Sequence, residues 1–227
     1  MRYFQRLFFL ALAAGVISGV FASALNIVIN VPMILEAEVF EHTSEHMTAG
    51  GQAPHEHGEG TASGRNLLTV TAMILAFAGY AFLVTVVAEV SGGLKSWWSG
   101  LLWGAGGFLA VGFVPALGLP PELPGMPAAD LVQRQLWWLS CAACTAGALL
   151  LIARDQRAPA YLLSALLLAA PFLFGAPVAP DTESLVPDDL HRLFVLGTLS
   201  TGFLSWLAMG VALGVLRSQK RWETGLA

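Results

Sequence analysis

Charged residues are scarce in this sequence. They make up 11% of its 227 residues, whereas a soluble domain carries about 25%. Hydrophobic residues make up 56%, and the mean hydropathy is +0.69. A chain with so few charges cannot cover a globular surface with polar groups, but lipid accepts it readily. The composition therefore predicts an all-α integral membrane protein, a polytopic bundle of transmembrane helices.

Several sequence motifs of ligand binding and catalysis are also absent. No lysine- or arginine-rich patch is present, so no nucleic-acid partner is expected. The segment from Gly92 to Ser96 ends in Lys-Ser but lacks the glycine spacing of a nucleotide-binding loop. Neither a GxSxG motif nor a helical HExxH motif occurs. We therefore predict a protein that is not an enzyme and that holds no tightly bound cofactor.

The chain has two cysteines, Cys141 and Cys144, in a CxxC pair. Such a pair near the end of a membrane helix suggests one alternative function, a thiol–quinone oxidoreductase. Enzymes of that kind normally need a second cysteine pair to relay electrons, and this chain has none. Two small apolar fillers explain the pair more simply, although the redox alternative stays open.

Six apolar segments are long enough, or nearly so, to cross a hydrocarbon core of about 30 Å, which takes around 20 helical residues. The fifth is short and begins at Pro159, so five spans remain possible. Arg2 and Arg6 precede a first apolar stretch that continues to about Leu35, which favours an uncleaved span over a secretory signal. Within a single transmembrane domain, 1–227, we place the spans near 7–31, 67–90, 98–118, 135–153, 159–176 and 193–216.

The charges predict an orientation. With six spans and both termini in the cytoplasm, eight of the eleven basic residues lie inside, as the positive-inside rule requires. This arrangement predicts a multi-pass membrane protein with both termini on the cytoplasmic side. The outer face then carries segments 36–65, 119–134 and 177–192, which hold twelve of the fifteen acidic residues. Such a surface attracts cations, although ordinary solvation of outer loops explains the same acids.

The external segment 36–65 contains four of the five histidines. If a helix resumes after Pro32, five ligand-type residues share one helical face, at i, i+3, i+4, i+7 and i+8. Imidazoles at i and i+4 can reach one ion, and mixed nitrogen and carboxylate ligands suit divalent transition metals. Capture then weakens as the pH falls through about 6.5. These five predicted metal ligands are Glu38, Glu41, His42, Glu45 and His46; further candidates are His55, His57 and His191, with Glu36, Asp188 and Asp189 as secondary ligands.

Polar side chains inside the spans suggest a route for an ion. The first and last predicted spans each carry a helical stripe of small and polar residues that leads inward from a histidine-bearing loop. Helix–helix packing needs the same residue types and is the alternative explanation. Glu89 is a candidate exit ligand or an interfacial carboxylate. The predicted translocation path comprises Asn26, Asn30, Met33, Thr198, Ser205 and Met209.

Small residues also recur at four-residue spacing in three of the predicted spans. This spacing lets helices approach closely and predicts a compact bundle or a homo-oligomer. The pairs are Gly15 and Gly19, Gly100 and Gly104, and Gly210 and Gly214.

Three stretches resemble the CbtA family, whose members are predicted cobalt transporter subunits associated with cobalamin biosynthesis. They are Val31-Pro-Met-Ile-Leu-Glu-Ala-Glu-Val-Phe-Glu, the proline-rich 115–130 followed by Arg134-Gln-Leu-Trp-Trp, and Pro187-Asp-Asp-Leu. The similarity extends over essentially the whole chain. It implies Co²⁺ as the transported ion, uptake as the direction, and a small single-span, histidine-rich membrane partner (CbtB-like). With this resemblance we expect a multi-pass protein of the bacterial inner (cytoplasmic) membrane. Members are usually described with five spans. A Ni²⁺ permease and a non-transporting scaffold remain alternatives.

Overall fold

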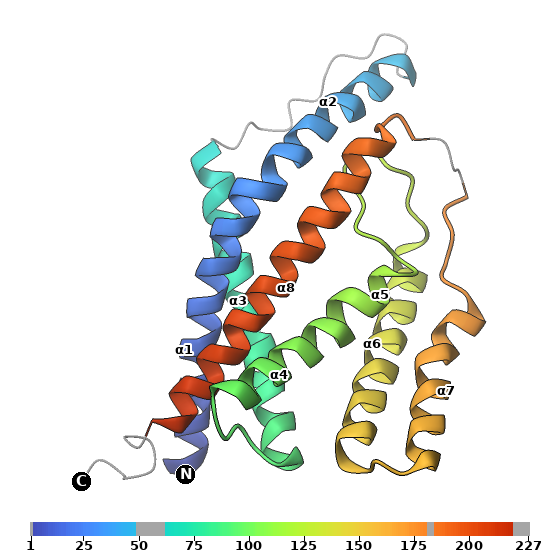
Figure 1. Cartoon of the computed structure of the whole chain (residues 1–227). Coiled ribbons are helices and arrows are strands. Elements are labelled where there is room, and N and C mark those ends of the chain that lie inside the picture. Colours follow the sequence, from blue (N-terminus) through green and yellow to red (C-terminus); the bar gives the residue numbers. More distant parts are fainter. Residues whose placement is uncertain (1, 49–61, 181–183, 220–227) are drawn as a thin grey trace.

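The computed structural model describes residues 2–48, 62–180 and 184–219, and this part of the chain is a bundle of helices without strands (Figure 1). Five of its helical segments are long and apolar enough to cross a membrane, and a sixth, of 17 residues, is shorter. The predicted all-α membrane bundle is therefore confirmed. The elements are α1 (Arg2–Leu25), η1 (Asn26–Asn30), α2 (Val31–Thr48), α3 (Ala62–Ser91), α4 (Trp97–Phe108), η2 (Leu109–Phe113), α5 (Val114–Ala116), α6 (Leu131–Arg154), α7 (Ala158–Phe174) and α8 (Asp188–Ser218).

The elements η1 and η2 are π-helical turns, and each stands just before a proline. A proline inside a helix lacks the N–H donor, and its ring clashes with the carbonyl four residues earlier. η1 ends two residues before Pro32, and η2 ends two residues before Pro115. The wider turn accommodates the ring, so the chain stays helical through both prolines. As a result α1, η1 and α2 form one continuous helix, and residues 36–48 are helical.

Glycines join the helices into two close pairs. In the α1–α3 pair, a Cβ added at Gly15 would overlap the backbone of Ala78. In the α4–α8 pair, a Cβ at Gly100 or Gly210 would overlap the backbone of the facing helix. Helices in lipid associate through such close backbone approach. The predicted small-residue spacing thus serves contacts within this chain.

Helices α6 and α7 form a hairpin that stands beside the other helices and reaches them mainly through η2 and α5 (Figure 1). The Ser164 hydroxyl of α7 donates to the carbonyl of Ala148, at 3.1 Å. The buried indole of Trp137 donates to the carbonyl of Pro171, also at 3.1 Å. These bonds join the two helices along their length.

The helices run alternately up and down, so the bundle has two distinct ends (Figure 1). The start of α1 and the end of α8 lie at the same end, where Arg217 of α8 donates to the hydroxyl of Tyr3 in α1. The ends of α3 and α6 and the start of α4 share it (Figure 1). We call this the basic end, because these segments and the loops beside them hold six of the nine arginines and lysines in the described part of the chain: Arg2, Arg6, Lys95, Arg154, Arg157 and Arg217. The opposite, acidic end holds α2, segment 117–130 and the start of α8.

Candidate functional site

The three segments predicted to face outward converge at the acidic end. A buried apolar cluster joins Ala37 of α2, Leu123 of segment 117–130, and Val186, Leu190 and Phe194 at the start of α8. Beside the cluster, the Nε2 atom of the fifth histidine, His191, lies 3.0 Å from the carbonyl oxygen of Pro121. Segments far apart in the sequence therefore form one surface.

The predicted ligands with described side chains are not gathered into one set. Glu36, Asp188 and Asp189 are exposed, and Glu38 lies 3.8 Å from the guanidinium of Arg65. Within the described residues, no three histidine, cysteine, aspartate or glutamate side chains come together to hold a metal ion.

The central predicted ligands lie at the far end of α2. The backbone of Glu41, His42, Glu45 and His46 is helical, as their proposed spacing on one face requires. Their side chains lie outside the described part of the chain, as do the histidines at 55 and 57 in full. Metal capture by these residues therefore stays a prediction.

Deeper in the bundle, η1 meets α8 in a buried polar cluster. The Asn30 amide nitrogen donates to Asn26 Oδ1 at 3.0 Å and to Thr201 Oγ1 at 3.1 Å. Thr201 in turn donates to the carbonyl of Thr198 at 3.1 Å. Two buried oxygens of this cluster, Asn30 Oδ1 and Thr198 Oγ1, have no hydrogen-bond partner among the described residues. A Cβ at Gly197 would lie 2.8 Å from Asn30 Oδ1, so this glycine lets the two helices meet.

The other predicted path residues lie above and below this cluster. Met33 packs against the apolar cluster of the acidic end. The Ser205 hydroxyl donates to the carbonyl of Thr201 at 2.7 Å, one turn deeper in α8. Met209 is fully buried in the central apolar core. Sequence reasoning missed Thr201, although it lies one turn from Thr198 on the same helix.

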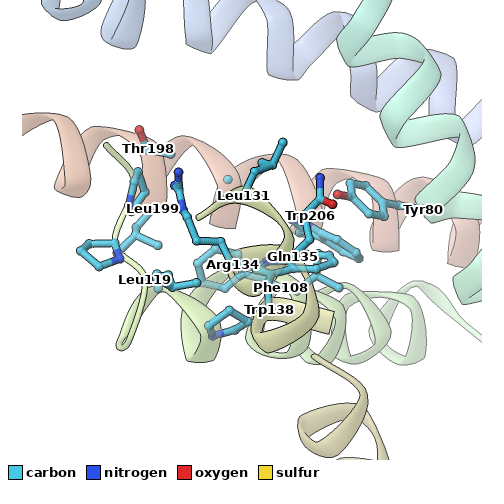
Figure 2. Close-up of a pocket in the computed structure, with 17 residues that line it drawn as sticks. Tyr80, Phe108, Leu119, Leu131, Arg134, Gln135, Trp138, Thr198, Leu199 and Trp206 are labelled. Atoms are coloured by element: carbon cyan, nitrogen blue, oxygen red, sulfur yellow. The ribbon is translucent and has the colours of Figure 1, made fainter. Parts of the chain in front are cut away.

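A cavity of about 480 Å³ adjoins the polar cluster, and no sequence pattern predicted it. Thr198 and Trp206 of α8 line one wall, and Gln135 of α6 faces them (Figure 2). Phe108, η2, α5 and the start of segment 117–130 add to the lining, and Tyr80 of α3 lies at one side (Figure 2). The lining is mostly apolar.

A single guanidinium, that of Arg134 in α6, borders this cavity. It lies 2.7 Å from the carboxylate of Glu122, which neutralises it. The polar pair Arg134–Gln135 at the start of an apolar helix is a sequence signal that could have pointed to this cavity. Arg134 is partly buried and is paired with Glu122, as an ionised side chain in a membrane-spanning helix is expected to be.

At the basic end, three side chains from three helices form a polar network. The Tyr3 hydroxyl of α1 donates to Glu89 of α3, and Arg217 of α8 lies 3.3 Å from the other carboxylate oxygen. The side chains of Arg217 and Glu89 are 25% and 21% exposed, so the pair is largely shielded from solvent. We call these three residues the basic-end network.

Cys141 and Cys144 are both free thiols on α6, the first buried and the second partly exposed. The Thr145 hydroxyl donates to the Cys141 carbonyl at 2.8 Å, a bond within the helix.

Apolar spans around a buried polar cluster and a cavity define a multi-pass helical membrane protein with polar groups in its interior. Residues 4–218 match the family model described as "Probable cobalt transporter subunit (CbtA)". The chain therefore belongs to the CbtA family, and a transporter subunit implies a partner. Searches of curated proteins and of solved structures found no match.

Proposed function

We propose that this protein is the Co²⁺-uptake subunit of its transporter: it collects the ion at the acidic end and passes it through the bundle to the basic end. The observation that carries the proposal is the buried polar cluster between η1 and α8. Four buried side-chain oxygens have no hydrogen-bond partner among the described residues, and two of them, Asn30 Oδ1 and Thr198 Oγ1, belong to this one cluster; the others are Thr85 Oγ1 and Glu89 Oε1. Unpaired oxygens inside a membrane protein are costly, and oxygen atoms are ligands for a divalent cation in transit.

We assign capture of the Co²⁺ ion to α2, which extends beyond the predicted first span to Thr48. Its carboxylates and histidines, with Asp188, Asp189 and His191 at the start of α8, supply negative charge and nitrogen ligands. Long-range attraction raises the local concentration of cations at such a surface. The exposure of Glu36 and of both aspartates suits weak capture and release.

The cavity supports passage of a partly hydrated ion. Its volume of about 480 Å³ is well above the roughly 30 Å³ that one water takes up in the liquid, and Thr198 and Gln135 supply polar groups to its mostly apolar lining. An ion entering beside Thr198 can therefore keep much of its hydration shell until it reaches the polar cluster. Because Glu122 neutralises the nearby guanidinium, that side chain does not repel the ion as an unpaired cation would.

The proposal also includes an orientation in the membrane, a partner subunit and a competing ion. The acidic end faces outward and the basic end faces the cytoplasm of a bacterial cell, in agreement with the placement of arginines and lysines. The partner is a small single-span, histidine-rich subunit, and the imported ion serves cobalamin biosynthesis. Ni²⁺ is the competing cargo, because nitrogen and oxygen ligands bind both ions.

Substitutions at Asn30 test the role of the buried polar cluster. Asn30→Leu fills the cluster with hydrocarbon and should lower radiolabelled Co²⁺ uptake by about tenfold, equivalent to a barrier raised by about 1.4 kcal/mol. Asn30→Asp keeps Oδ1 and replaces the donating amide nitrogen by a second oxygen, so the two hydrogen bonds are lost but the oxygen ligands are not, and uptake should be retained. The control is Ser140→Ala on α6, whose exposed hydroxyl donates to the Leu136 carbonyl of its own helix. Uptake that is unchanged in Asn30→Leu at equal protein level would contradict the proposed path.

A further inference from the structure

The two glycine-locked helix pairs identify where the bundle can open. Within α1–α3 and within α4–α8, backbone lies directly against backbone at Gly15 and at Gly210. Close-packed interfaces of this kind resist continuous deformation, so each pair is expected to move as a unit. Motion then concentrates at the surface between the two pairs, which we call the seam.

Contacts across the seam change in character from the acidic end to the basic end. First comes the hydrogen bond from Asn30 to Thr201. Next, the indole of Trp206 packs on the ring of Tyr80 with centroids 4.8 Å apart. Leu213 of α8 is fully buried below it. The basic-end network closes the seam. From the polar cluster and the cavity toward the basic end, the seam is therefore first apolar, at Tyr80, Trp206 and Leu213, and then polar, at the basic-end network.

The basic-end network spans the two units. Tyr3 and Glu89 belong to the α1–α3 pair, whereas Arg217 belongs to the α4–α8 pair. By contrast, the ion pair of Asp155 with Arg157 lies within one loop at the same end and joins no helices. A shielded pair that keeps some contact with solvent favours a closed state, yet it is weak enough to be broken repeatedly.

We propose that the basic-end network is a gate that seals the seam on the side where the ion is delivered. This inference rests on the proposed function, because it assigns a closing device to the same path. In the structure the gate is shut: Glu89 holds both the Tyr3 hydroxyl and the Arg217 guanidinium. A divalent cation that reaches the Glu89 carboxylate competes with Arg217 for it, so arrival of the ion favours opening.

Cysteine accessibility tests the gate without any metal. Val84→Cys, five residues before Glu89 on α3, places a thiol of similar size in the buried core that also contains Leu213, in a chain whose two native cysteines are replaced by alanine. A water-soluble maleimide is then reacted with the full chain in lipid nanodiscs. Glu89→Gln should raise the labelling rate of the introduced thiol by about fivefold, a shift of about 1 kcal/mol in the closed state. Asp155→Asn, at the same end, should leave the rate unchanged.

Two further variants keep the test decisive. Tyr3→Phe removes one hydroxyl and should give a smaller rise, whereas the exchange Glu89→Arg with Arg217→Glu should restore slow labelling. An unchanged rate in both Glu89→Gln and Tyr3→Phe overturns the gate. Because labelling needs no ion, this result is separate from failure of the proposed function, which would show as absent Co²⁺ uptake by the unmodified chain both alone and with its partner.

Discussion

The substitution Gly210→Ala tests the locked α4–α8 pair. The added Cβ would lie 2.8 Å from Gly104 N and 2.9 Å from its Cα, and it would overlap the carbonyl oxygen of Gly100. Ordinary van der Waals contact begins near 3.4 Å, so the helices must separate by about 0.6 Å at Gly104 and by more at Gly100. Overpacking of this size costs about 1–3 kcal/mol.

The matched control is Gly79→Ala on α3, where an added Cβ meets no atom within 4 Å. Both substitutions gain the same helix propensity, about 1 kcal/mol, so their difference isolates the helix contact. Unfolding of each variant in mixed micelles of increasing SDS content, followed by tryptophan fluorescence, gives the free energies. Gly210→Ala should be the less stable of the two by about 1–3 kcal/mol. Equal stabilities would refute the assignment of a backbone lock at this position.

Three further predictions concern capture, redox chemistry and the cavity rim. His42→Ala with His46→Ala should raise the Co²⁺ concentration needed for half-maximal uptake by about tenfold, since two nitrogen ligands are lost; an unchanged concentration dependence would end the capture role. The double variant Cys141→Ala with Cys144→Ala should leave Co²⁺ uptake intact. If this variant loses both uptake and a redox activity, the oxidoreductase alternative is favoured. Glu122→Gln leaves the Arg134 guanidinium without its carboxylate and should lower the free energy of unfolding by about 1 kcal/mol in the same SDS titration. An unchanged free energy would show that this ion pair does not stabilise the protein.

Composition and hydropathy were sufficient for the fold class, because lipid admits few alternatives to the helix. The course of the chain at Pro32 was harder to predict. Proline usually ends or kinks a helix, and the outcome here depends on whether the preceding turn can widen. That property belongs to the packing of η1 against α8 and is not visible in residue types. The same holds for η2 before Pro115.

Helical periodicity predicted which candidate residues share one face of a helix, but not which residues of other helices they contact. Helical spacing placed Asn26 and Asn30 on one stripe, and the structure shows them hydrogen-bonded. Spacing does not say which helix faces that stripe, so the partner Thr201 was missed. The ion pair of Glu89 with Arg217 joins residues from opposite halves of the chain, and the cavity arises between helices of the two pairs and the hairpin. Only the tertiary arrangement brings such groups together.

The central claim is that this chain moves Co²⁺ across a membrane. The most direct test is the accumulation of radiolabelled Co²⁺ in cells that express the full chain alone, and then with a candidate single-span partner. We expect accumulation above that of cells carrying an empty vector, reduced by excess unlabelled Co²⁺. No accumulation above the vector control in either case, with the protein present in the membrane, would contradict it.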